Sequence, residues 1–249
     1  ALELSSMLLN LTPKHNVIVP SFTFVTTALA FTRNGAELRF ADIDPVTLCM
    51  SPTSVSELVD SETRAIVPVH YAGISADLEE LEQIVDAFED ISMVEDNAHG
   101  LFGSHRGLPL GSFGRFSTLS FHETKNFSCG EGGALVINQE QDVPRAHVLY
   151  DKGTNRAAFE KGEIDRYTWV DQGSSFGMSD LLAGFLLGQL EQRSQIMEKR
   201  KDIFDQYHRL LSSMQEHLGF HVPVVQKWQQ PGYHMYYVLT SDEARRTEI

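Results

Sequence analysis

A lysine with polar neighbours follows a predicted buried strand in the middle of the chain. Lys125 lies in the stretch STLSFHETKNFSCGEGGALVI (117–137), between an alternating apolar run and a glycine-rich turn. A partly desolvated lysine at the rim of a sheet can lose its proton and attack a carbonyl carbon. The stretch therefore predicts a nucleophilic amine, although a lone lysine in a turn is more often a solvated charge.

Other residues with useful chemistry stand near strand ends: Phe24 follows the predicted strand NVIVP, Asp96 ends the strand ISMVED, and Ser120 lies five residues before Lys125. An aspartate can keep a pyridine nitrogen protonated, which pyridoxal 5′-phosphate needs if it is to act as an electron sink. An aromatic ring can stack on that cofactor, and a serine hydroxyl can donate to its phosphate. Together with Lys125, these residues predict a pyridoxal 5′-phosphate site, whereas Asp96 alone is more often a helix cap or a structural acid.

Histidines near the same strand ends raise the question of a metal site. His70, His99 and His122 do not stand four residues apart on a predicted helix, and the two cysteines form no CxxC motif, so we predict no metal. The glycine clusters GSFG and GEGG match neither a P-loop nor a GxGxxG motif. The side chains expected to contact substrate are His70, Tyr71, His122 and Asn126.

The elements that must position these residues alternate along the chain. Apolar runs predict strands at 16–20, 37–43, 65–71, 91–96, 115–121 and 133–137. Helical periodicity falls between them, at 23–33, 51–59, 76–88 and 141–150. This alternation predicts an α/β fold with a mostly parallel sheet and helices on both faces. Ligands bind at the carboxyl ends of such strands, so the fold can gather the candidate residues at one rim.

Three parts are expected along the chain. Residues 1–178 form the large cofactor-binding domain, and their last part, 154–178, is a long irregular loop. Such a loop is usually functional or in contact with a partner. Residues 179–217 are predicted as one long connecting helix, and 218–249 as the start of a smaller α+β domain. The chain begins and ends within a pattern, so we expect further residues at both ends.

Composition limits the classes of partner. The net charge of −14 argues against nucleic acid or an anionic membrane surface as the main partner. No apolar run approaches the length that spans a bilayer. Two cysteines without a disulfide framework fit a reducing cytoplasm.

Seven separated motifs together resemble a known family. They are PSFTFVTTALA, VPVHYAG, VEDNAHG, SFHETKN, GEGGALVIN, KGTNR and YTWVDQGSSFGMSDLLAG, in this order, and the resemblance that they carry runs from the first residues to about Tyr237. In this combination they resemble the DegT/DnrJ/EryC1/StrS family of pyridoxal-phosphate sugar aminotransferases. The resemblance implies the aspartate-aminotransferase fold, which is fold type I among pyridoxal-phosphate enzymes.

The resemblance also implies roles for single residues. Lys125 matches the lysine that binds the cofactor's aldehyde and then moves the proton, and Asp96 matches the acid that pairs with the pyridine nitrogen. His99 matches a residue near the cofactor's ring oxygen, Phe24 the aromatic on its ring, and Ser120 a phosphate ligand. The Ser/Thr phosphate-binding segment of the family would precede Ala1.

The function implied is transfer of an amino group from glutamate to a keto-sugar nucleotide by a homodimer. The expected acceptor is dTDP-4-keto-6-deoxyglucose, which gives dTDP-4-amino-4,6-dideoxygalactose for lipopolysaccharide or enterobacterial common antigen synthesis. Loop 154–178 would then reach the neighbouring subunit. Two alternatives stay open: a different keto-sugar or a cyclitol as acceptor, and a non-catalytic binding protein that kept the fold. Relatives that replace the lysine with histidine dehydrate instead, so Lys125 favours amino transfer.

Overall fold

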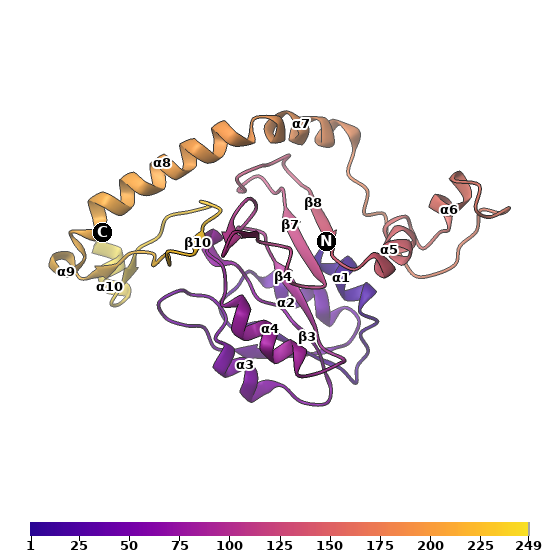
Figure 1. The fold of residues 1–249 in the computed structure, drawn as a ribbon, viewed down its shortest axis with the longest axis horizontal. Coiled ribbons are helices and arrows are strands. Elements are labelled where there is room, and N and C mark those ends of the chain that lie inside the picture. The colour runs from indigo at the N-terminus through magenta and orange to yellow at the C-terminus, as the bar shows by residue number, and fades with distance from the viewer. Residues whose placement is uncertain (249) are drawn as a thin grey trace.

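A six-stranded sheet forms the centre of the protein in the computed structural model, which describes residues 1–248 (Figure 1). Its strands lie in the order β2 (Glu37–Ala41), β1 (Asn16–Pro20), β3 (Thr63–Ile66), β4 (Ser92–Asp96), β7 (Phe116–Ser120) and β8 (Gly133–Ile137). All neighbouring strands run parallel except β7 and β8, which pair antiparallel. The predicted α/β fold with a mostly parallel sheet is confirmed.

Helices cover both faces of this sheet because the strands are apolar on both sides. Val17 and Val19 of β1 pack into one core with helices α1 (Leu2–Leu8), α2 (Val25–Thr32) and α5 (Val143–Tyr150). Ile18, between them, packs into the other core with α3 (Pro52–Leu58) and α4 (Leu78–Asp86). Successive strand residues point to opposite faces, so one apolar run serves both cores.

Two predicted elements differ from the structure. The strand predicted at 65–71 ends at Ile66, because Pro68 has no N–H to donate, and only a bridge between Val69 and Asp96 continues the pairing. The helix predicted at 179–217 consists of three helices, α7 (Asp180–Glu191), α8 (Arg193–Ser212) and α9 (Gln215–Leu218). Gln192 leaves helical geometry between the first two, with φ −99° and ψ 16°.

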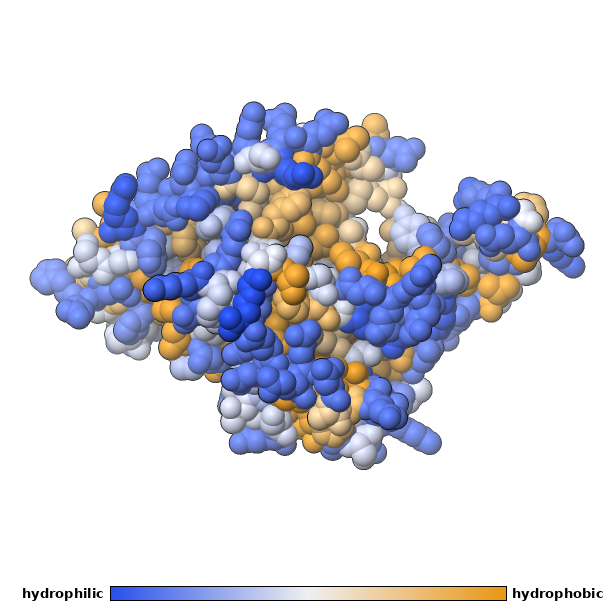
Figure 2. Space-filling model, in the orientation of Figure 1, coloured by the Kyte–Doolittle hydropathy of each residue, from blue (hydrophilic) through white to orange (hydrophobic). Residues whose placement is uncertain are grey.

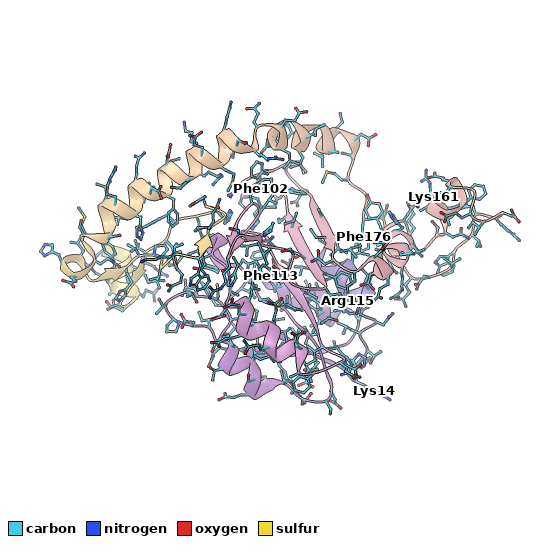
Figure 3. The ribbon with its side chains drawn as sticks, in the orientation of Figure 1. Lys14, Phe102, Phe113, Arg115, Lys161 and Phe176 are labelled. Atoms are coloured by element: carbon cyan, nitrogen blue, oxygen red, sulfur yellow. The ribbon has the colours of Figure 1, made fainter. Side chains whose placement is uncertain are left out.

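The loop at 154–178 forms an excursion from the body of the protein. It contains the short helix α6 (Arg156–Glu160), and Figure 3 shows Lys161 near its far end. Phe176, where the chain comes back, packs against the core beside α5. The two ends of the excursion touch closely, because a Cβ on Gly173 would lie 2.0 Å from the backbone nitrogen of Gly153.

The C-terminal part of the chain leaves the sheet along α8 and then comes back to it (Figure 1). Away from the sheet, β9 (Phe220–His221) pairs with β11 (Leu239–Thr240), and α10 (Glu243–Glu248) follows. Between these strands, residues 228–238 run toward the sheet, and we call them the return segment.

The return segment joins the large part of the protein through a small second sheet. Its strand β10 (Gln229–Gln230) pairs antiparallel with β5 (Ser104–His105), which pairs with β6 (Leu108–Pro109). The division at 178 and 217 stays a prediction, but by its contacts the return segment belongs with the sheet. Among the helices of residues 1–248, none is both long enough and apolar enough to cross a bilayer.

Candidate active site

Lys125 lies in the loop between β7 and β8. Its backbone N–H donates to the carbonyl of His122 at 2.9 Å, which closes a turn directly after the strand. The side chain is half-buried, and this burial lowers the pKa of the ammonium, while the negative charge of Asp96 partly offsets the shift. The structure therefore brings the predicted lysine and the predicted aspartate together, and it favours the neutral, nucleophilic amine.

Asp96 is the last residue of β4, and only 4% of it is exposed. One carboxylate oxygen accepts from the Thr27 hydroxyl at 2.7 Å, and the other accepts from the N–H of Ala98 at 3.2 Å. Burial raises the pKa of Asp96, and the hydrogen bond from Thr27 opposes that shift. A carboxylate has about four acceptor positions, so Asp96 can take a further donor. A protonated pyridine nitrogen fits this need.

The start of α2 holds two parts of the site. Because Thr27 donates to Asp96, its 2.7 Å bond with Thr23 must have the Thr23 hydroxyl as donor. Phe24 lies between these threonines at the N-cap of the helix, and it is 74% exposed. An exposed ring one turn from Thr27 is available for stacking on a planar ligand.

His99 follows Asp96 on the same rim. Its Nδ1 accepts from the N–H of Ala72 at 3.3 Å, and Ala72 itself has a left-handed backbone with φ 56°. Burial, followed by the charges of His234 and Lys125, lowers the pKa of His99 to about 3. The ring is therefore neutral near pH 7 with its proton on Nε2, from which it can donate to an oxygen.

His70 is fully buried, and both of its ring nitrogens are occupied. The N–H of Ala76 donates to Nδ1 at 3.2 Å, so Nε2 carries the proton and donates to Glu95 at 2.9 Å. The assignment of His70 as a substrate contact stays a prediction. In this arrangement neither ring nitrogen is free to bind a substrate. Tyr71, in contrast, is partly exposed, and its ring lies 5.9 Å from that of His99.

Three further predicted residues surround the lysine. Ser120 ends β7, and its Oγ accepts from the N–H of His122 at 3.4 Å. The ring of His122 is partly exposed and lies beside Thr124, at 3.1 Å between Nδ1 and Oγ1. Asn126 donates to the return segment, at 2.5 Å from its Nδ2 to the Gly232 carbonyl. The roles of these residues toward phosphate and substrate stay predictions.

Two residues of this site were missed by the sequence reasoning. Thr27 lies inside a helix rather than at the end of a strand, and nothing in the sequence marks it. His234 stacks on His99, with 4.2 Å between the ring centroids and 20° between the planes. It comes from far along the chain, and only its aromatic neighbourhood, YHMYY, could have drawn attention to it. Within residues 1–248, no three His, Cys, Asp or Glu side chains are grouped to hold a metal ion.

Curated proteins with similar sequences are longer than this chain. An uncharacterized protein of Methanocaldococcus jannaschii is 28% identical over 241 residues, which cover 96% of this chain and 61% of that protein. The spore coat polysaccharide biosynthesis protein SpsC of Bacillus subtilis is 30% identical over 236 residues, which cover 94% of this chain and 59% of that protein. The chain thus spans about three fifths of the length of these relatives.

A solved structure confirms the fold. The putative sugar aminotransferase Spr1654 from Streptococcus pneumoniae, in its PLP form, aligns with a TM-score of 0.86 and 27% identity, over 97% of this chain and 64% of that one. The profile of the DegT/DnrJ/EryC1/StrS aminotransferase family matches residues 1–249, the whole chain. The sheet whose rim gathers Lys125, Asp96 and His99 therefore has the fold type I architecture, and the chain belongs to the DegT/DnrJ/EryC1/StrS aminotransferase family.

Proposed function

We propose that this chain carries the cofactor site of a pyridoxal-phosphate-dependent aminotransferase that acts on keto-sugar nucleotides. The observation that carries the proposal is the pairing of a half-buried lysine, whose pKa is lowered by burial, with a buried aspartate that has room for another donor. Neither arrangement is needed for folding alone, because each buries a charge with few partners. Membership of the family gives the reaction class.

The residues present fit the cofactor in chemistry. Asp96 would hold the pyridine nitrogen, Lys125 the aldehyde carbon, and Phe24 one face of the ring. His99 would donate from Nε2 to the ring oxygen, and Ser120 would donate to the phosphate. When bound, pyridoxal 5′-phosphate supplies a protonated ring that withdraws electrons from the α-carbon of an attached amino acid.

The side chains of this chain would perform the proton chemistry. Lys125 Nζ would take the α-proton of the donor amino acid, and its burial lowers the pKa of the ammonium, which favours the neutral amine that can accept a proton. Asp96 keeps its negative charge when a cationic N–H faces it, because the new hydrogen bond and the charge both lower its pKa. His99 stays neutral and serves only as a hydrogen-bond donor.

For the substrates, we propose glutamate as donor and dTDP-4-keto-6-deoxyglucose as acceptor, with dTDP-4-amino-4,6-dideoxygalactose as product. The seven motifs and the family support a keto-sugar acceptor, and this particular acceptor is the finer part of the proposal. A different keto-sugar or a cyclitol is the alternative, and product identification with a panel of sugar nucleotides and a keto-inositol separates the two. The buried free thiols of Cys49 and Cys129 fit the proposed reducing cytoplasm.

We also propose that the protein works as a homodimer through α7. This helix is apolar around most of its circumference, yet Leu186 is its only buried side chain. Leu181 is 87% exposed and Phe185 64% exposed, and Figure 2 shows an apolar area next to this helix. An exposed apolar area of this kind favours contact with another copy over contact with solvent. Sedimentation equilibrium of the Leu181→Asp variant tests this assembly, which should become monomeric.

The cofactor proposal is tested by chemical trapping. Pyridoxal 5′-phosphate is added to the protein, borohydride reduces the adduct, and mass spectrometry maps the modified peptide. We expect the label on Lys125, and its loss in Lys125→Ala. Lys161→Ala is the matched control, because Lys161 is an exposed lysine on the α6 excursion. Labelling of surface lysines without Lys125 would contradict the proposal and favour a binding protein that kept the fold.

A further inference from the structure

The return segment carries a histidine that none of the predicted roles uses. We propose that His234 is a positioning residue of the active site, which acts through His99 by fixing the plane of its ring and covering one of its faces. The proposal rests on the proposed function, since it assigns His99 a donor role toward the cofactor. The stack itself is a direct observation, with ring centroids 4.2 Å apart and planes at 20°.

The ring of His234 is held by the residue that follows Lys125. The Asn126 amide nitrogen donates to the Gly232 carbonyl at 2.5 Å, so its oxygen is free to accept from His234 Nδ1–H at 3.1 Å. This bond fixes the proton of His234 on Nδ1. The orientation of His234 is therefore tied to the loop that holds the lysine.

The backbone on either side of His234 is anchored as well. The N–H of Gly232 donates to the Gly73 carbonyl at 2.8 Å, next to Ala72, which itself donates to His99. A Cβ on Gly232 would lie 2.7 Å from the His99 carbonyl, so only glycine allows this approach. From α8, Arg200 donates to the carbonyl of His234 at 3.4 Å.

A second anchor holds the start of the return segment. Trp228 packs against the ring of His105 at 4.7 Å and lies under the guanidinium of Arg106, 5.0 Å from the ring centroid. Gln229 donates to the carbonyl and the hydroxyl of Ser75, at 3.0 and 2.8 Å. Because of these anchors at 228–229, at Gly232 and at the carbonyl of His234, the position of His234 is set by the protein rather than by a mobile tail.

Two stacked imidazoles restrain each other's protonation. Burial is the main cause that lowers the pKa of His99 to about 3 and that of His234 to about 4. The other ionisable groups that act on the pair are Lys125, which faces both rings, and Arg200, which faces His234. Arg200 is a cation, and Lys125 is one in its protonated form, so each opposes a proton on the ring that it faces. Both rings are neutral near pH 7, and their tautomers follow from their hydrogen bonds.

The consequence is a defined donor beside Lys125. His99 accepts at Nδ1 and donates at Nε2, while His234 donates at Nδ1 and keeps Nε2 as an acceptor. Without His234, one face of the His99 ring would be open to water. Its pKa would then return toward the ordinary value of about 6.5, and the ring could turn or take a proton in weak acid.

The test compares His234→Ala with His234→Phe, which keeps a flat ring, and with the control His217→Ala, an exposed histidine on α9. The first readout is the ¹⁵N NMR titration of His99 in cofactor-free protein. We expect His99 to stay neutral with its proton on Nε2 from pH 5 to 8 in the parent, the control and His234→Phe. In His234→Ala it should titrate within that range.

The second readout is the dissociation constant of pyridoxal 5′-phosphate. We expect it to rise about threefold to tenfold in His234→Ala, because this is the range for the loss of one aromatic stack.

An unchanged His99 titration in His234→Ala would overturn the inference, whatever the activity. If His234→Ala does not fold, His234→Gln replaces it, because glutamine keeps a donor for Asn126 but has no stacking ring. The NMR titration tests the positioning role without cofactor. Borohydride mapping of Lys125 tests the proposed function in the parent protein, without a histidine variant. Failure of the positioning role and failure of the proposed function are therefore seen in separate measurements.

Discussion

Two neighbouring carboxylates at the end of β4 are both buried, yet they respond to burial in opposite ways. Glu95 is fully buried and accepts four hydrogen bonds at 2.8 to 2.9 Å, from the His70 ring and the N–H groups of Gly111, Phe113 and Gly114. Although burial by itself raises the pKa of Glu95, the His70 bond and these N–H groups bring it below its ordinary value. For Asp96, burial dominates and raises the pKa.

The difference lies in how many donors each carboxylate has. Glu95 has a partner for every acceptor position, and it stabilises the turn at 111–114. Within the part of the chain that the structure describes, the Asp96 carboxylate accepts only from Thr27 and Ala98. A buried anion with unused acceptor positions destabilises the fold, and a bound cation can offset this destabilisation. The pair thus separates a structural acid from a functional one.

The largest effect is expected from Glu95→Gln. The amide nitrogen of the new glutamine would face two backbone N–H groups that donate to the Glu95 carboxylate in the parent. At least two charge-assisted hydrogen bonds would therefore be lost. We expect the free energy of unfolding to fall by about 3 kcal/mol or more, measured by urea denaturation. Glu131→Gln is the control, because that side chain is 84% exposed and should change stability by less than about 0.5 kcal/mol. A loss as small as the control's would contradict the structural role of Glu95.

Asp96→Asn should have the opposite profile. The asparagine oxygen can still accept from Thr27, and the penalty for burying a charge disappears, so stability should stay within about 1 kcal/mol of the parent or rise. A neutral amide cannot balance a pyridine cation, so the affinity for pyridoxal 5′-phosphate should fall about tenfold to a hundredfold. Absorbance titration gives the affinity. Destabilisation equal to that of Glu95→Gln would remove the distinction between the two acids.

The two variants should also diverge with pH. The depressed pKa of Glu95 means that its contribution is complete above the unfolded value of about 4.3 and is lost as pH falls through the folded pKa. The deficit of Glu95→Gln should therefore shrink in acid. The raised pKa of Asp96 means that its penalty is absent below about pH 3.9 and grows as pH rises to the folded pKa. Over that interval, the free energy of unfolding of Asp96→Asn should rise relative to that of the parent. Urea unfolding of both proteins at pH 3.5 to 7 measures this difference. Parallel curves would contradict the assignment.

Much of this arrangement could be predicted from the sequence. The apolar run NVIVP predicted β1 with its observed bounds, and the rule that ligands bind at strand ends brought Lys125, Asp96 and His99 to one rim. The strand ends reflect local chemistry, which a sequence shows directly. The extra length predicted for β3 has the same local origin, because the apolar pattern continues past Pro68 while the regular strand ends at Ile66 and only the bridge between Val69 and Asp96 follows.

The missed features depend on contacts between distant parts of the chain. Asn126 and His234 are 108 residues apart, and only the path of the return segment joins them. Glu95 is distinguished from Asp96 by the backbone of a turn 16 to 19 residues later, which no side-chain pattern reveals. The break at Gln192 has no Pro or Gly to mark it. Local patterns thus predicted the elements, whereas tertiary contacts decided the charge state of each group.

The smallest effect, and the sharpest test of the comparison, concerns Thr27. Thr27→Val keeps the shape of the side chain but removes the hydroxyl that opposes the burial-induced rise in the pKa of Asp96. Stability should fall by about 1 kcal/mol, and the pKa should rise further, so that cofactor binding weakens first at the acid end. Thr23→Val is the matched control, because it removes only the donor to Thr27. Cofactor titrations from pH 5 to 8 should place the acid limit of binding highest for Thr27→Val, intermediate for Thr23→Val and lowest for the parent. A larger shift for Thr23→Val would mean that Asp96 is not controlled by its direct donor, and the contrast with the fully bonded Glu95 would lose its cause.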